Sequence, residues 1–446
     1  MSKLLLSNAR LVNEGEISDV DVLIDGERIS RIAASIAEPE DATVIDLAGK
    51  YLMPGMIDDQ VHFREPGMTY KGDLATESAA AAAGGITSFM DMPNVKPLTT
   101  TREVLRDKYD IARNRCTSNY GFYLGATNSN IEEVKALKVG EAAGIKAFMG
   151  ASTGDMLVDS PEALEGLFEH APVIVLTHCE DSPMIWANES AAREKFGDDV
   201  PFSEHPSIRS AEACLKSSSY AVEMASRHDA LLHVLHLTTA IEMGLFSNAH
   251  RSQKRITAEV CVHHLWFDES RYDELGANIK CNPAIKRRED REALIAALND
   301  RRIDIIATDH APHTAEEKAE KYFRSPAGLP LVQHALLTLF DLAKDGQISV
   351  ELIVDRACHA PADILGVADR GYVREGYFAD FAIVDPNSPY RVEASNLLSK
   401  CQWSPFAGHE FSASIDTTIV NGDVVYRDGQ LTGIVAGQKL EFGRTR

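Results

Sequence analysis

The pattern that most restricts the fold is a series of short apolar runs separated by segments with helix-like composition. Eight alternations of strand and helix predict an α/β protein with a (β/α)8 TIM-type barrel, whose active site lies at the C-terminal ends of the strands. In the helical segment 71–85, Gly84 and Gly85 would end the helix by supplying a left-handed residue. The eight predicted strands are residues 54–63, 86–94, 119–127, 144–150, 172–180, 230–238, 256–265 and 302–312.

The two ends of the chain have a different pattern. Residues 1–50 alternate apolar and polar residues in short runs with turns between them, and similar runs return at 378–386 and 417–431. Asn421-Gly422 is a hairpin turn signal within the last run. We therefore predict one small composite β-sandwich built from both termini, in preference to two unrelated β flaps. The expected division is residues 1–52 and 366–446 (with a C-terminal tail) for the β-sandwich and 53–365 for a metal-dependent catalytic barrel.

Composition excludes some classes of function. The formal net charge of -22 argues against binding nucleic acid, whose phosphates need a basic surface. Seven cysteines without a CxxC pair do not indicate a disulfide framework or a zinc finger, and reduced buried thiols fit a reducing compartment. The N-terminal apolar run is too short for a signal peptide, and no run reaches membrane-spanning length. We expect a cytoplasmic protein with no membrane association.

Polar residues gather where the predicted strands end. A single histidine at such a place is more often a hydrogen-bonded structural residue than a ligand. The joint set of His62, His178, His236 and Asp309 is more informative, because converging nitrogen and oxygen donors suit zinc or a similar divalent ion. The other polar residues at these ends are Gln60, Asn94, Lys146, His263, His264, His310 and His313.

Gln60 stands where a second histidine would complete a metal-binding pair with His62. Side chains alternate along a strand, so Asp58, Gln60 and His62 should share one face while Asp59 points to the other. Asp59 is therefore not expected to replace a ligand. Asp58 lies a two-residue step deeper, about 6.6 Å along the strand, and is better placed to orient a ligand than to be one. Gln60 offers only a neutral amide oxygen, so one half of the site should be weak.

In this order and spacing, the strand-end motifs resemble those of class I dihydroorotases of the amidohydrolase superfamily over nearly the whole chain. That family has a (β/α)8 barrel with a composite β-sandwich, which agrees with the fold predicted above. The motifs are HFREPG (62–67), DMPN (91–94), GIKAFMG (144–150), THCED (177–181), HVLHLT (233–238), CNPAIKRREDREAL (281–294) and ATDHAPH (307–313).

The resemblance implies a metal centre with zinc as its cofactor. His62 would bind the more buried ion with Asp309 close to it, and His178 and His236 would bind the second. Lys146 matches the lysine that many relatives carboxylate to bridge the two ions. One or two ions per chain are expected.

The resemblance also implies a substrate site and shows one departure. Arg64, Asn94 and His313 match residues that grip a substrate carboxylate, which Arg can bind in bidentate fashion. Asn282 is assigned to substrate binding as well. The departure is Gln60, where the family usually has the first histidine of an HxH pair. Because the other ligands are retained, the sequence predicts an enzyme with an altered metal site.

The implied reaction is the reversible cyclisation of N-carbamoyl-L-aspartate to L-dihydroorotate in de novo pyrimidine biosynthesis. A metal-bound hydroxide would attack the ring amide, with Asp309 as general base and then acid. The expected partners are the small-molecule substrate, a second copy in a homodimer and aspartate carbamoyltransferase.

Three alternatives stay open. Another cyclic-amide hydrolase, such as an allantoinase or hydantoinase, is disfavoured by the pairing of Arg64 with Asn94, which suits a carboxylate. A non-catalytic scaffold for aspartate carbamoyltransferase is disfavoured by the retained Lys146 and Asp309. A deaminase-like barrel would lack a bridging lysine.

Overall fold

The computed structural model describes residues 3–150 and 156–443. Each of the eight predicted apolar runs contains a barrel strand, and neighbouring strands pair in parallel. His263 and His264, expected at the end of a strand, lie instead in a short helix that follows it. The barrel strands are β6 (Met56–Val61), β7 (Ile86–Asp91), β8 (Asn119–Phe122) continued by β9 (Leu124–Gly125), β10 (Ile145–Phe148), β11 (Val175–His178), β12 (Leu232–Val234), β13 (Ile256–Cys261) and β14 (Ile305–Ala307).

The strands close into a ring. One sheet runs from β14 to β9 and another joins β6, β7 and β8, and the chain itself connects β8 to β9. At the remaining seam Val61 forms a parallel bridge with His310, and the His62 amide donates to the His310 carbonyl at 2.7 Å. The predicted (β/α)8 fold class is confirmed.

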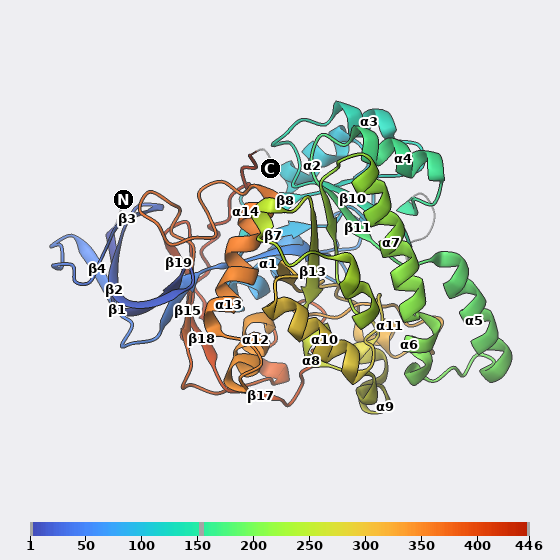
Figure 1. The fold of residues 1–446 in the computed structure, drawn as a ribbon. Helices are drawn as coiled ribbons and strands as arrows, with labels where there is room; N and C mark the ends of the chain where they lie inside the picture. The colour runs from blue at the N-terminus through green and yellow to red at the C-terminus, as the bar shows by residue number, and fades with distance from the viewer. Residues whose placement is uncertain (1–2, 151–155, 444–446) are drawn as a thin grey trace.

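Helices connect most of the strands and surround the ring (Figure 1). The helix after β6 begins at Asp73, which caps it by accepting from Thr76, and ends before Gly85, whose φ of 78° is the left-handed conformation predicted there. The helices are α1 (Leu74–Ala83), α2 (Arg102–Ala112), α3 (Ile131–Ala136), α4 (Pro161–His170), α5 (Ser182–Phe196), α6 (His205–Ile208), α7 (Ala211–Arg227), α8 (Val262–Trp266), α9 (Tyr272–Leu275), α10 (Arg288–Asn299), α11 (Ala315–Lys318), α12 (Ala335–Lys344), α13 (Val350–Val354) and α14 (Ala360–Leu365). No helix in these ranges is long and apolar enough to cross a membrane.

Strands from both termini form one nine-stranded sheet beside the barrel (Figure 1). Its order is β20-β19-β18-β15-β5-β1-β2-β3, with β4 beside β1, and the antiparallel pair β5–β15 joins the two ends of the chain. The composite β domain is therefore confirmed as part of the fold, while the limits at residues 52 and 365 stay predictions. The strands are β1 (Lys3–Asn13), β2 (Glu16–Asp25), β3 (Arg28–Ala33), β4 (Ala42–Asp46), β5 (Tyr51–Pro54), β15 (Phe381–Asp385), β18 (Ser414–Val420), β19 (Asp423–Arg427) and β20 (Gln430–Leu431), with a separate hairpin of β16 (Tyr390–Arg391) and β17 (Glu410–Phe411).

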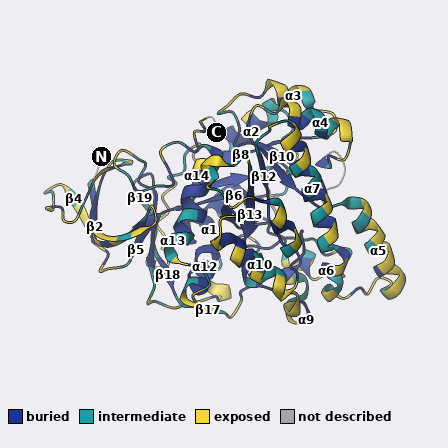
Figure 2. Ribbon diagram, viewed as in Figure 1, coloured by how far each residue is buried: buried dark blue, intermediate teal, exposed yellow. Residues whose placement is uncertain are grey.

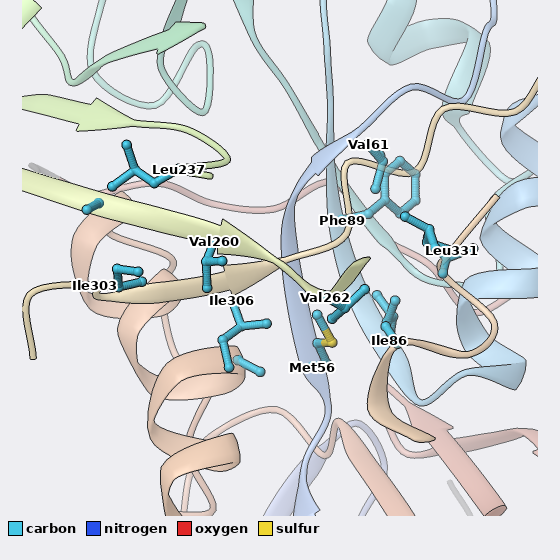
Figure 3. Packing of buried hydrophobic residues seen from close by; sticks show 14 of the residues in the cluster. Met56, Val61, Ile86, Phe89, Leu237, Val260, Val262, Ile303, Ile306 and Leu331 are labelled. Carbon is cyan, nitrogen blue, oxygen red and sulfur yellow. The ribbon is translucent and has the colours of Figure 1, made fainter. Parts of the chain in front are cut away.

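The main core lies between the barrel strands and the helices. Buried residues lie at the centre of the molecule and exposed ones on the outer helices, including α5 and α9 (Figure 2). Val61, Val260 and Ile306 belong to this core and lie among the side chains of Figure 3. Because side chains alternate on a strand, the neighbours of Val260, which are Glu259 and Cys261, face the barrel interior.

The C-terminal tail covers the end of the barrel at which the strands begin. Leu440 and Phe442 pack in one cluster with Ala143, two residues before β10, and Ile174, directly before β11. The tail also pairs with β8 through a bridge between Lys439 and Tyr120. The opposite end of the barrel, where the predicted site residues lie, is therefore the end available for a substrate.

Candidate active site

The predicted residues lie at the C-terminal ends of the barrel strands. His62 follows β6, His178 ends β11, and His236 and Asp309 each come two residues after their strands. His236 has φ 38° and Asp309 φ 50°, and Arg64 has φ 70°. A positive φ costs a non-glycine residue conformational energy, and such residues cluster at functional sites because the surroundings hold them there. Three such residues at one end of the barrel indicate that the fold holds their side chains in a specific orientation that serves function.

The first half of the site is built around Asp309. His62 Nε2 lies 3.1 Å from Asp309 Oδ1, and the same oxygen accepts from Gln60 Nε2 at 3.2 Å. His62 Nδ1 lies 2.8 Å from Asn94 Oδ1, which fixes the ring with Nε2 towards Asp309. Burial tends to raise the pKa of Asp309, but the hydrogen bond to His62 and the nearby His62, His263 and Lys146 side chains together outweigh it, so the pKa lies below its usual value. Asp309 is therefore an ionised carboxylate at neutral pH.

The second half of the site contains two histidines side by side. The rings of His178 and His236 meet edge to face, with centroids 4.5 Å apart. His178 Nε2 is held by Glu180 Oε2 at 2.8 Å, and Arg209 holds the same carboxylate oxygen at 2.6 Å. This leaves Nδ1 of His178 as its free ligand atom. Nδ1 of His236 is buried and has no hydrogen-bond partner within the described residues.

Lys146 projects from β10 into the barrel and is completely buried. Its Nζ has no hydrogen-bond partner among residues 3–150 and 156–443, although a buried ammonium without partners is costly. Burial lowers the pKa of Lys146 to about 8. Both observations favour the neutral amine of Lys146, or a modified form of it, over the charged ammonium.

These residues fit a metal centre. Histidine nitrogens without hydrogen-bond partners among the described residues and an ionised carboxylate are donor types that a divalent ion uses. His178 and His236 would hold one ion, His62 and Asp309 another, and Lys146 would contribute to both when carboxylated. Glu180 and Asn94 orient the ligating rings, as outer partners of metal-bound histidines do.

The strict alternation predicted for β6 is wrong. Asp59 does not point away from the barrel interior: its Oδ2 lies 3.5 Å from His233 Nε2 on β12. Gln60, the next residue, lies against Cys261 Sγ at 4.0 Å. The physical reason is a register irregularity between Asp58 and Val61 in the pairing of β6 with β7, which turns two successive side chains inward.

A group of basic side chains adjoins the site. Arg64 is buried, and its Nε donates to the Pro312 carbonyl at 3.1 Å. Its Nη2 lies 3.1 Å from His313 Nε2, and Lys71 Nζ lies 3.0 Å from His313 Nδ1. Lys71 is paired with Glu317 at 3.0 Å, whereas the side-chain partners of Arg64 in the described ranges are a carbonyl and an imidazole, with no carboxylate within ion-pair distance. A buried, unpaired guanidinium beside the site can bind an anionic group.

The other predicted substrate residues have different surroundings. Asn94 uses its oxygen on His62, so only its amide nitrogen remains for a substrate. Burial lowers the pKa of His313 far below its usual value, with Arg64 next in effect, so His313 is neutral. Asn282 precedes a cis proline, and its buried Oδ1 has no partner among the residues described. Their assignment to substrate binding stays a prediction.

Sequence reasoning missed several supporting residues. Glu180 orients His178, and Glu259 Oε1 accepts the His236 amide at 3.0 Å, which holds the unusual backbone there. Asp58 was predicted to orient a ligand, and it accepts from the Thr308 amide and hydroxyl at 3.1 and 2.6 Å, directly before Asp309. An acidic residue two positions after the strand-end histidine was the available signal for Glu180.

Comparisons with known proteins agree with this geometry. The model of the amidohydrolase family matches residues 51–425. A dihydroorotase of Clostridium acetobutylicum is 33% identical over 417 residues, covering 92% of this chain and 95% of that protein. A dihydroorotase of Halobacterium salinarum is 32% identical, covering 97% and 99%. An L-hydantoinase (dihydropyrimidinase) structure from Arthrobacter aurescens superposes with a TM-score of 0.93 at 25% identity, covering 99% of this chain and 100% of that one.

A closed barrel with histidines, a lysine and an aspartate at its open end defines the class of barrel hydrolases with a candidate metal centre. The chain belongs to the amidohydrolase family. The prediction of an enzyme is thereby confirmed at the level of a hydrolase.

Proposed function

We propose that the protein is a dihydroorotase, which interconverts N-carbamoyl-L-aspartate and L-dihydroorotate in pyrimidine biosynthesis. The observation that carries the proposal is Arg64, a buried cation without an anionic partner in the described residues, next to the Asp309 site. Dihydroorotate has a carboxylate beside its cyclic amide, whereas hydantoin and dihydropyrimidine rings need not have one. The names of the two relatives support the same substrate, and the name of the superposed hydantoinase supports a cyclic amide.

In the proposed mechanism the residues divide the work of binding and proton transfer. Arg64 binds the substrate carboxylate, with Asn94, Asn282 and His313 as further contacts, and holds the ring amide towards Asp309. Asp309 accepts the proton of the attacking water at Oδ and then gives it to the departing ring nitrogen. A bound divalent ion lowers the pKa of water and polarises the amide carbonyl.

We infer an uneven metal centre with zinc. His178, His236 and a carboxylated Lys146 would supply three protein ligands to one ion, which is the usual number in a catalytic zinc site. A second ion would have His62, Asp309 and the same carboxylated Lys146, while the amide nitrogen of Gln60 faces Asp309 and its oxygen faces Cys261. Gln60 therefore contributes little, and the second ion should be bound weakly.

Gln60→His should raise the zinc content by about one ion per chain, because an imidazole nitrogen would complete the weak half of the site. The measurement is zinc content by mass spectrometry after dialysis against a fixed free zinc concentration. Gln60→Met is the matched control, since it keeps the length and removes the oxygen; its zinc content should equal that of the unaltered chain. Full zinc occupancy of both the His178–His236 position and the His62–Asp309 position in the unaltered protein would contradict the uneven centre.

Arg64→Ala should lower kcat/KM for dihydroorotate. The expected loss of transition-state stabilisation is about 2–4 kcal/mol, because a charged partner of the substrate carboxylate is lost. Dihydrouracil is the same ring without the carboxylate, and the variant removes no group that touches it. Its kcat/KM, already low in the unaltered chain, should therefore change by less than about threefold. Comparison of the two substrates separates loss of carboxylate binding from general damage. Equal losses on both substrates would contradict the role of Arg64.

The function itself is tested by steady-state turnover after zinc and bicarbonate are supplied. We expect dihydroorotate to be preferred over hydantoin, dihydrouracil and allantoin. Preference for a ring without a carboxylate would favour another cyclic-amide hydrolase, and no turnover of any of them would favour the scaffold for aspartate carbamoyltransferase. The homodimer, that association and the cytoplasmic location stay predictions.

A further inference from the structure

A second group of metal-ligand side chains lies deeper in the barrel. Asp59 from β6, His233 from β12 and Glu259 from β13 meet there, and all three residues have 0% exposure. One potential ligand atom from each of them lies within 4.8 Å of the others. None of the three has a task in the proposed reaction. His233 lies within β12, three residues before His236, so this group is deeper in the barrel than the active site.

The distances within the group are too long for hydrogen bonds. His233 Nε2 lies 3.5 Å from Asp59 Oδ2 and 3.7 Å from Glu259 Oε2, whereas an N–H···O bond spans about 2.7–3.2 Å. Two ligands that are each about 2.1 Å from a tetrahedral ion lie about 3.4 Å apart. The spacing therefore matches ligands around a shared cation better than it matches a hydrogen-bonded cluster.

The facing atoms have no other partners. Both carboxylate oxygens of Asp59, Nε2 of His233 and Oε2 of Glu259 are buried without a hydrogen bond among the described residues. No lysine or arginine in those ranges lies within ion-pair distance of either carboxylate. Unsatisfied buried polar groups cost free energy, and they are rare in folded proteins unless a ligand, water or ion satisfies them. One such atom from each of the three residues lies within 4.8 Å of the others, an arrangement that suits a shared ligand.

The histidine is oriented as a ligand. Thr257 Oγ1 donates to the Leu232 carbonyl at 3.3 Å, so this oxygen accepts from Nδ1–H of His233 at 2.8 Å. The neutral ring then carries its lone pair on Nε2, which faces the two carboxylates. A fixed tautomer, held through the other ring nitrogen, is the arrangement that metal-binding histidines adopt.

We propose that Asp59, His233 and Glu259 bind a structural divalent cation inside the barrel, separate from the catalytic centre. One imidazole and two carboxylates suit zinc or manganese. Two anionic ligands neutralise the ion, and the ion in turn removes the need to bury two uncompensated carboxylates. Glu259 also accepts the His236 amide through its other oxygen, so the ion would hold this strand end in place from below.

Anomalous X-ray diffraction from crystals of the full-length chain grown with zinc tests the site directly. The expected result is a zinc peak between Asp59 Oδ2, His233 Nε2 and Glu259 Oε2, at about 2.0–2.2 Å from each. Zinc at His178 and His236 in the same crystals shows that the metal reached the barrel. A peak at that centre with none at Asp59 would overturn the proposal.

Metal counting with a variant provides a second test. Asp59→Asn should lower the zinc content of the purified chain by about one ion, because two ligands alone seldom retain zinc. Glu242→Gln is the control: Glu242 is also buried, but Ser218 and Thr239 donate to its two oxygens at 2.5 and 2.6 Å. Its zinc content should equal that of the unaltered chain. An unchanged count in Asp59→Asn would contradict the proposal, and the diffraction test decides if that variant does not fold.

Discussion

Asp309→Asn lowers the turnover of dihydroorotate by about 10³- to 10⁴-fold, which is the upper part of the range for loss of a general acid–base group. Burial raises the pKa of Asp309, but the hydrogen bond to His62 together with the nearby His62, His263 and Lys146 side chains keeps it below its usual value, so the native group is a carboxylate that can accept a proton. An amide of the same shape cannot accept that proton. The measurement is kcat for dihydroorotate with zinc content determined on the same sample.

The controls separate lost chemistry from lost structure. Asp107→Asn makes the same chemical change on the exposed surface of α2 and should leave kcat unchanged. Circular dichroism of Asp309→Asn should match that of the unaltered chain, since the asparagine can keep the hydrogen bond from Gln60. If the variant binds its normal zinc and retains most of its activity, Asp309 is not the proton-transfer group.

The fold could be predicted because its signals are local. Each barrel strand is an apolar run bounded by polar or turn residues, and eight such runs in alternation with helices leave one common architecture. The composite sheet was predictable for the same reason, because period-two patterning marks strands at both ends of the chain. His263 and His264 were misplaced because Val262 continues the apolar run of β13 although the backbone already turns into α8.

The site was predictable only in outline. Strand-end histidines mark where chemistry gathers, but the partner of each depends on pairings distant in sequence. Arg209 donates to the Glu180 carboxylate that holds His178, and Gln60 donates to Asp309. These residues are far apart in sequence and come together only when the barrel closes. Asp59 was predicted wrongly because alternation assumes a regular strand, and the irregularity in β6 comes from its pairing with β7.

Lys146→Ala should remove the zinc held at His178 and His236 and reduce turnover of dihydroorotate by about 10³-fold or more, since several kcal/mol of metal catalysis are lost. The reason lies in the surroundings of Lys146. A free ammonium at a completely buried position without partners in the described residues would repel a cation. Burial lowers its pKa to about 8, which increases the neutral amine that can react with carbon dioxide. The carbamate proposed to form there would be an anion with two oxygens, which are suitable ligands for a divalent ion.

Chemical rescue distinguishes a carboxylated lysine from a free one. Acetate supplies the carboxylate that Lys146→Ala lacks, so it should restore part of the zinc content and of kcat, in proportion to its concentration until saturation. Methylamine resembles the free lysine head group and should restore neither. Rescue by the amine alone, or full zinc content in Lys146→Ala without additives, would mean that Lys146 acts as an unmodified cation. Partial rescue by acetate alone would establish that the buried position requires an anion, because acetate supplies a carboxylate and no amine.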